Sequence, residues 1–99
     1  MIKRIVVMHL MPGKVEQFIE IFEHIKQEVR NQQGCLSLEL LRSAHPEESN
    51  VCTLSLWQSA NDLETYRASA LFRKTWDQVK PLFDAKAQAW TFTTVEALP

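Results

Sequence analysis

The feature that most constrains this chain is the segment "RIVVMHLMPG", residues 4–13, which has the pattern of a β-strand with apolar side chains on both faces. Successive side chains of a strand point to opposite faces. One face therefore carries Val6, Met8 and Leu10, and the other carries Ile5, Val7 and Met11. Because both faces of such a strand need apolar residues packed against them, the fold has to bury both faces itself or leave one face to a second molecule.

The length and the charge of the chain limit both its architecture and its possible partners. A chain of 99 residues is expected to form a single domain, residues 1–99, and a domain of this size buries only about 60 to 65% of the surface of its unfolded chain. Its core is then two layers deep. The formal net charge is -1, and basic residues are scattered among acidic ones rather than gathered on one face. This distribution argues against nucleic acid as a partner.

The first residues and the cysteines indicate a cytoplasmic chain. The run "MIKRIVVMHLM" is short for a secretion signal, and no small-residue cleavage site follows it. No segment approaches the roughly 20 apolar residues that cross a bilayer, so we expect no membrane partner. Cys35 and Cys52 lack CxxC spacing and are expected several residues apart along paired strands, which is too far for a disulfide. Reduced thiols are typical of the cytoplasm.

Periodicity predicts four strands and two helices. Apolar residues recur at steps of three and four over residues 14–32, which predicts the first helix. Ser59, with Asp62 three residues later, is typical of a helix start, and Ser69 is expected to interrupt the second helix that begins there. Strands are predicted over residues 2–11, 35–43, 50–58 and 87–95.

This order of elements predicts an α+β fold, the ferredoxin-like β-α-β-β-α-β sandwich, in which a four-stranded antiparallel sheet carries both helices on one face. The other sheet face is left bare. Exposing three or four of its apolar side chains forgoes about 1.5 to 3 kcal/mol each, which in total is comparable with the ~5 to 15 kcal/mol stability of a domain. We therefore predict a homodimer through the open sheet face, with Val6 under the helices and His9 on the dimer side.

Several kinds of site are not indicated. The three histidines fall in a strand, on a wet helix face and in a turn, so we expect no metal site. The only glycines are Gly13 and Gly34, and each is expected in a turn next to a helix, which argues against a phosphate-binding loop. No G-x-S-x-G segment occurs, and nothing marks either cysteine as an activated nucleophile.

Aromatic residues are the remaining signal, and most of them lie in the second half of the chain. The simpler interpretation is that they fill the core of a small domain. The functional interpretation is that some of them line an apolar pocket between the sheet and the second helix, with Tyr66 as its polar group. His9 has the same two interpretations, as a hydrogen-bonded interface residue or as a catalytic group.

The string "GCLSLEL" at residues 34–40, a strand ending "LWQS" at 56–59, and "LETYRASALFRKTW" at 63–76 together resemble the antibiotic biosynthesis monooxygenase (ABM) family. The resemblance covers nearly the whole chain, including "MPGK" before the first helix. It implies a dimeric α+β barrel, which agrees with the dimer predicted above. Members of that family include cofactor-independent oxygenases of quinols and polycyclic phenols, haem-degrading enzymes, and proteins without a known role.

Individual positions narrow what the resemblance implies. The haem-degrading branch has Asn, Trp and His where this chain has Val6, Tyr66 and Trp76. Because Val6 forms no hydrogen bond and Trp76 cannot bind iron, the resemblance implies neither haem degradation nor any cofactor. Other members often carry His at the positions of Tyr66 and Leu71. The Trp of the third strand is kept as Trp57, whereas the acid that often lies two residues earlier is Ser55.

Two hypotheses from different functional classes follow. The first is a cofactor-independent monooxygenase of a small aromatic quinol or phenol, in which Tyr66 orients or deprotonates the substrate and His9 is the reserve proton acceptor. The second is a non-catalytic dimeric barrel that binds a small apolar ligand. Asp62, one helical turn before Tyr66, either assists it or only caps the helix. The predicted substrate contacts are Val6, Met8, Trp57, Asp62, Phe72, Trp76 and Trp90.

Overall fold

The computed structural model describes all residues from 1 to 99 and contains two successive β-α-β units. The second helix is divided into two parts, and a short 3-10 helix follows it. The elements are β1 (Ile2–His9), α1 (Val15–Arg30), β2 (Cys35–Arg42), β3 (Asn50–Trp57), α2 (Ala60–Arg67), α3 (Ala70–Val79), η1 (Lys80–Leu82) and β4 (Gln88–Thr93).

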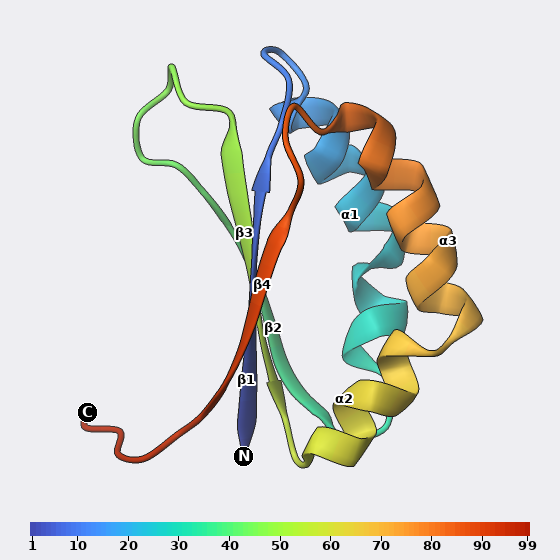
Figure 1. Ribbon diagram of the computed structural model, residues 1–99, viewed down its shortest axis with the longest axis vertical. Helices are drawn as coiled ribbons and strands as arrows, with labels where there is room; N and C mark the ends of the chain where they lie inside the picture. The colour runs from blue at the N-terminus through green and yellow to red at the C-terminus, as the bar shows by residue number, and fades with distance from the viewer.

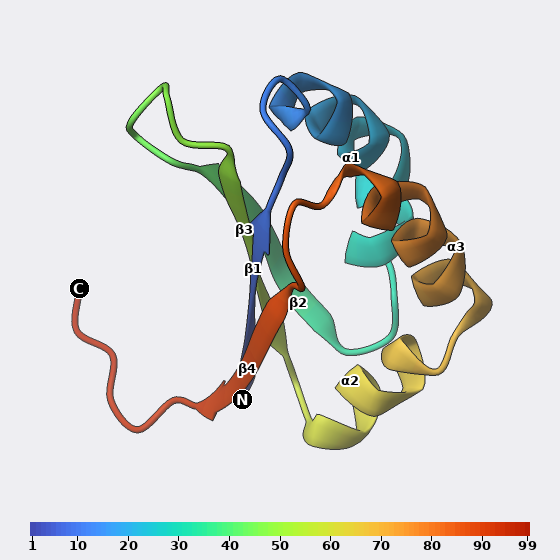
Figure 2. The same ribbon diagram turned by 45° about the horizontal axis from the view of Figure 1, so that its top comes forward.

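The four strands form one antiparallel sheet in the order β2-β3-β1-β4. All three α-helices lie on the same face of this sheet, and the opposite face has no helix against it (Figure 1). Figure 2 shows the same two layers after rotation. The predicted ferredoxin-like α+β sandwich is therefore confirmed. No helix of the protein has the length and apolar character needed to cross a membrane.

The alternation along β1 decides which residues form the core. Its even-numbered side chains, among them Val6 and Met8, are buried under the helices, while its odd-numbered ones remain partly exposed. This is the predicted assignment of the two faces. From the helix side, Phe18, Ile25 and Val29 of α1 are buried, because three- and four-residue steps place them on one stripe.

The ends of the helices differ slightly from the predicted ones. α1 ends at Arg30 rather than at Gln32, and Gly34 adopts a φ of +81° in the turn that leads into β2. A Cβ at Gly34 would meet the side chain of Asp62, so the residue needs both its conformation and its missing side chain. Ser69 does interrupt the second helix, since it caps α3 by accepting a hydrogen bond from the Phe72 backbone N–H.

The face of the sheet that lacks helices is apolar. Trp90 and Phe92 of β4 expose 44% and 53% of their surface, and Leu41 of β2 exposes 43%. The residues after β4 extend away from the body on this bare side (Figure 1), and they carry the exposed Val95 and Leu98. A single chain therefore leaves an apolar sheet face in water.

Both cysteines are free, as expected. Cys35 pairs with Trp57 at one end of the β2–β3 ladder, and Cys52 pairs with Leu41 toward the other. Burial raises the pKa of the Cys35 thiol, with the positive charge of Arg30 partly opposing the effect, and burial likewise raises the pKa of Cys52. Thiols with raised pKa values are poor nucleophiles.

Candidate functional site

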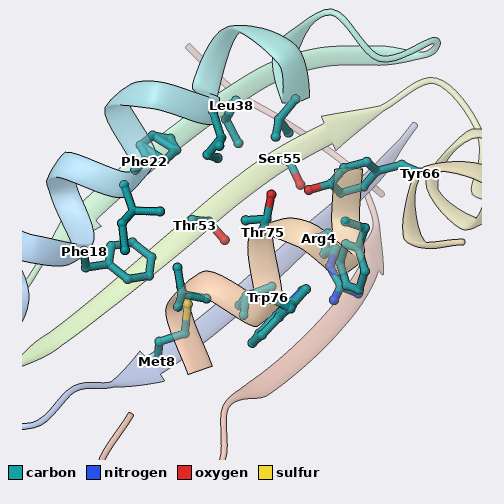
Figure 3. Close-up of a pocket in the computed structure, with 16 residues that line it drawn as sticks. Arg4, Met8, Phe18, Phe22, Leu38, Thr53, Ser55, Tyr66, Thr75 and Trp76 are labelled. Atoms are coloured by element: carbon teal, nitrogen blue, oxygen red, sulfur yellow. The ribbon is translucent and has the colours of Figure 1, made fainter. Parts of the chain in front are cut away.

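A cavity of about 80 Å³ lies between the helix-covered face of the sheet and the helices α1 and α3 (Figure 3). Three strands form its floor, and its roof consists of apolar side chains from α1 and α3 together with Tyr66 at the end of α2. Its lining consists of Arg4, Val6, Met8, Phe18, Ile21, Phe22, Ile25, Val29, Leu38, Thr53, Ser55, Tyr66, Phe72, Thr75, Trp76 and Val79.

A continuous series of aromatic contacts runs along one side of this cavity. The ring of Trp57 stacks on that of Tyr66 with centroids 5.1 Å apart, and Phe72 meets the edge of Tyr66 at 5.3 Å. The series continues through Trp76, 5.8 Å from Phe72, to Phe83. Such pairs add to the stability of the packing and fix the ring planes. The orientation of Tyr66 is therefore set from both sides.

Tyr66 belongs to a polar end of the cavity that also contains Ser55 and Arg4. Arg4 and Ser55 face each other across the β1–β3 ladder, and Figure 3 shows the Tyr66 hydroxyl directed toward the same region. The Ser55 hydroxyl accepts a hydrogen bond of 2.9 Å from the Trp57 indole N–H. The opposite end is apolar and contains Met8 and Phe18.

Burial controls the charge state of the two titratable groups at the polar end. It raises the pKa of Tyr66 to about 12, although the positive charge of nearby Arg4 acts in the lowering direction. At neutral pH the phenol is therefore protonated and donates a hydrogen bond. Burial also lowers the pKa of Arg4, and Arg67 adds to this effect. An arginine remains charged at neutral pH nevertheless.

An outer, open hollow adjoins the cavity on the side of η1 and β4. Arg4, Val6, Phe72 and Trp76 line both spaces and so separate them. The cavity alone is smaller than the ~150 Å³ apolar cavity known to hold benzene. A bound ring therefore needs additional room, and Phe72 and Trp76 form part of the wall between the cavity and the larger hollow.

The structure brings together most of the predicted site residues. Val6, Met8, Tyr66, Phe72 and Trp76 all line the cavity. Trp57 does not line it but lies directly behind Tyr66, with its side chain fully buried.

The other three predicted residues lie elsewhere. Asp62 accepts a hydrogen bond from the Ser59 hydroxyl, its backbone N–H donates one back, and its carboxylate contacts Gly34, so its observed contacts are those of a cap. His9 and Trp90 are on the bare face, which the sheet separates from the cavity. The His9 ring nitrogen Nδ1 lies 2.7 Å from the side-chain oxygen of Asn50.

Four polar residues of the cavity were not predicted from the sequence, namely Arg4, Thr53, Ser55 and Thr75. Arg4 shares the even parity of Val6 and Met8 on β1, which places its side chain under the helices. The same parity argument, applied to β3 from Trp57, places Thr53 and Ser55 in the cavity. Thr75 lies one residue before Trp76 on α3 and is hydrogen-bonded to the Leu71 carbonyl.

These groups define what the cavity can do chemically. It offers apolar walls, hydroxyl groups and one cation, and no Asp, Glu or His lines it. A ligand therefore meets hydrogen-bond donors and a positive charge but no side chain that accepts a proton at neutral pH. Elsewhere in the protein, no three His, Cys, Asp or Glu side chains gather as a metal ion requires.

Comparison by sequence gives one family. The model of the family described as antibiotic biosynthesis monooxygenase (ABM) matches residues 1–78. A comparison with curated protein sequences gives no match.

Comparison by structure gives many matches of the same kind. A protein from Nitrosomonas europaea, provisionally described as an antibiotic biosynthesis monooxygenase, has a TM-score of 0.88 at 16% identity, and the alignment covers 97% of this chain and 100% of the other. A similarly described protein from Caulobacter crescentus has a TM-score of 0.86 at 24% identity, covering 96% and 90%. SnoaB from Streptomyces nogalater, a cofactor-independent oxygenase, has a TM-score of 0.86 at 16% identity, covering 99% and 96%. At these identities the likeness shows the fold.

Proposed function

Because this chain belongs to the antibiotic biosynthesis monooxygenase family, we propose that it is a cofactor-independent monooxygenase of a small aromatic quinol or phenol. The proposal takes residues 1–99 as one cytoplasmic domain. The observation that carries it is the cavity itself, in which apolar and aromatic walls surround a single phenol donor, Tyr66. The likeness to SnoaB, described as a cofactor-independent oxygenase, supports the same reaction class.

Oxygenation of a quinol without a cofactor requires little of the protein beyond an apolar cavity with a hydrogen-bond donor. A quinol and O₂ give a hydroxyquinone and water, so one oxygen atom enters the ring, the other leaves as water, and the quinol supplies all four electrons. The reactive species is the quinol anion, which itself reduces oxygen; because the cavity holds no proton acceptor, the proton is lost to solvent water. The cavity has to hold the ring between apolar walls, exclude water and stabilise the developing anion.

In this proposal Tyr66 orients the substrate rather than deprotonating it. A phenol with a pKa of about 12 is a poor proton acceptor at neutral pH but a good donor to a substrate oxygen. Trp57 and Phe72 fix the Tyr66 ring, and Val6, Met8 and Trp76 act as walls.

We also propose that the working form is a homodimer through the bare sheet face. Trp90 and Phe92 would then be interface residues rather than substrate contacts. His9, which lies on the same face beside Asn50, would belong to the interface as well. The exposed apolar side chains on this face support the arrangement, as does the extended C-terminal segment beside it.

Oxygen uptake with a panel of quinols, compared between wild type and Tyr66→Phe, tests the proposed role of Tyr66. Tyr66→Phe keeps the ring and its stacking but removes the hydrogen-bond donor. We expect the rate to fall by about 10- to 100-fold, as for loss of one hydrogen bond to a developing charge. Equal uptake by both proteins would show that Tyr66 has no part in the reaction.

The alternative is a non-catalytic dimeric barrel that binds a small apolar ligand. The small volume of the cavity and the lack of a proton acceptor in it favour this function. Binding of neutral aromatic compounds together with no oxygen uptake above the protein-free rate, for every quinol of the panel, would select it.

A further inference from the structure

Arg4 is the only charged residue that the protein buries, with 7% of its surface exposed. It lies on the helix-covered face of β1, between Ser55 of β3 and Thr91 of β4. Buried charges are almost always paired, because removing a charge from water is costly. The surroundings of Arg4 should therefore contain a partner.

The protein itself provides no direct ion pair, although the negative charge of Glu64, which pairs with Arg67, acts on Arg4 in the direction that raises its pKa. Its three ion pairs are Lys26–Glu23, Arg42–Glu16 and Arg67–Glu64, and the Arg4 guanidinium donates no hydrogen bond to any protein atom. Every side-chain nitrogen that is fully sealed from solvent has a hydrogen-bond partner. Because the N–H groups of Arg4 have none, they must border open space. Arg4 lines both the cavity, as Figure 3 shows, and the adjoining hollow.

The charged residues around the outer hollow are mostly basic. Apart from Arg4 it is lined by Arg67, Lys80 and Lys86 against the single acid Asp84, although the chain as a whole has a net charge of -1. A cleft with an excess of one charge attracts ligands of the other. An anion would thus be drawn along the entrance toward the unpaired guanidinium.

We infer that the cavity takes an aromatic ligand bearing a carboxylate, and that Arg4 binds this acid group at the polar end while the ring extends toward Met8 and Phe18. A carboxylate fits the planar guanidinium through two parallel hydrogen bonds. A phenol fits less well, since it is neutral in solution and gains nothing from the basic entrance. The inference rests on the proposed function only for the nature of the ring as a quinol or phenol.

Calorimetric titration with salicylate and salicylamide tests this inference. The two compounds share the ring and the hydroxyl group, but salicylate carries a negatively charged carboxylate where salicylamide carries a neutral amide. We expect wild type to bind salicylate at least about tenfold more tightly, the effect of one charge-assisted contact. In Arg4→Met this preference should disappear, whereas Arg73→Met, which removes an exposed cation of α3 that lines neither the cavity nor the hollow, should keep it within about threefold.

A melting curve of the ligand-free proteins shows whether misfolding causes the loss of preference in Arg4→Met. Because Arg4→Met removes an unpaired buried charge, its melting temperature should equal or exceed that of wild type. Equal affinity of wild type for the two compounds, no binding of salicylate, or a retained preference in Arg4→Met would each overturn the inference. Salicylate binding through Arg4 without oxygen uptake from any quinol would refute the monooxygenase and leave this inference standing.

Discussion

At the scale of single residues, the polar end of the cavity pairs a phenol that resists ionisation with a cation that has no counter-ion. Burial of Tyr66 and Arg4 under the helices disfavours the charged form of each, and neither residue forms an ion pair within the protein. The pair is suited to receive an anion. Tyr66 donates a hydrogen bond, Arg4 supplies the charge, and neither competes for the proton of the ligand at neutral pH.

The protonation state of Tyr66 gives the first prediction. Tyr66 is the only tyrosine, so the absorbance of tyrosinate reports this residue alone. We expect a midpoint of about 12 in the native protein and near 10 in denaturant. Because the folded pKa is the higher one, the contribution to stability is complete below pH ~10 and is lost as the pH rises toward 12, by roughly 2 to 3 kcal/mol.

Arg4→Met provides the control for this titration. Arg4 acts to lower the pKa of Tyr66, so its removal should move the native midpoint further upward. A native midpoint near 10, or a downward shift in Arg4→Met, would contradict the description of the polar end.

At the scale of elements, the junction between α2 and α3 positions the cavity wall. The Ser69 hydroxyl donates a hydrogen bond of 2.6 Å to the Tyr66 carbonyl and accepts one from the Phe72 backbone N–H. One side chain thus binds the carbonyl of Tyr66 in the last turn of α2 and caps α3 three residues before the wall residue Phe72. The break in the helix is therefore part of the construction of the site.

Ser69→Ala and Ser59→Ala make a matched pair, because each removes the N-cap of one of these helices. We expect each variant to lose about 1 kcal/mol of unfolding free energy in urea denaturation. Only Ser69→Ala should also slow quinol-dependent oxygen uptake, since it releases both Tyr66 and Phe72. Equal uptake by the two variants would show that the junction does not position the site.

The elements were largely predictable from periodicity, whereas the site was only partly so. The three- and four-residue steps of α1 and the parity of β1 predicted what is buried, because burial of an apolar face determines both patterns. The aromatic side of the cavity followed from the same patterns. Arg4 did not, because a charged residue beside Lys3 looks like an exposed flank until the helices are placed over its face. Where α1 ends depended on local turn geometry at Gly34.

At the scale of the whole molecule, the bare sheet face is the feature that a single copy leaves unexplained. Leaving Trp90, Phe92 and Leu41 in water forgoes roughly 1.5 to 3 kcal/mol for each fully buried side chain, which is large beside the stability of a small domain. A second copy offers a matching face by symmetry. The proposed dimer would bury these side chains and so recover the free energy that a single copy forgoes.

Sedimentation of wild type and Phe92→Glu at micromolar concentration tests the dimer. We expect wild type to sediment as a dimer and Phe92→Glu to dissociate at least about tenfold more readily, because the substitution places a charge in an apolar interface. Gln17→Glu, which adds the same charge on the exposed surface of α1, should behave as wild type. A stable, folded wild-type monomer would contradict the proposed assembly.

The most direct test of the central claim, that oxidation takes place in the cavity under the helices, is the rate of quinol-dependent oxygen uptake in Thr75→Phe and Thr65→Phe. Each threonine donates a hydrogen bond to the carbonyl four residues earlier, but Thr75 lines the cavity and Thr65 is exposed on α2. We predict that Thr75→Phe fills the cavity and abolishes uptake, while Thr65→Phe keeps the wild-type rate. Uptake by Thr75→Phe equal to that of Thr65→Phe, or no uptake by wild type above the protein-free rate, would contradict the account.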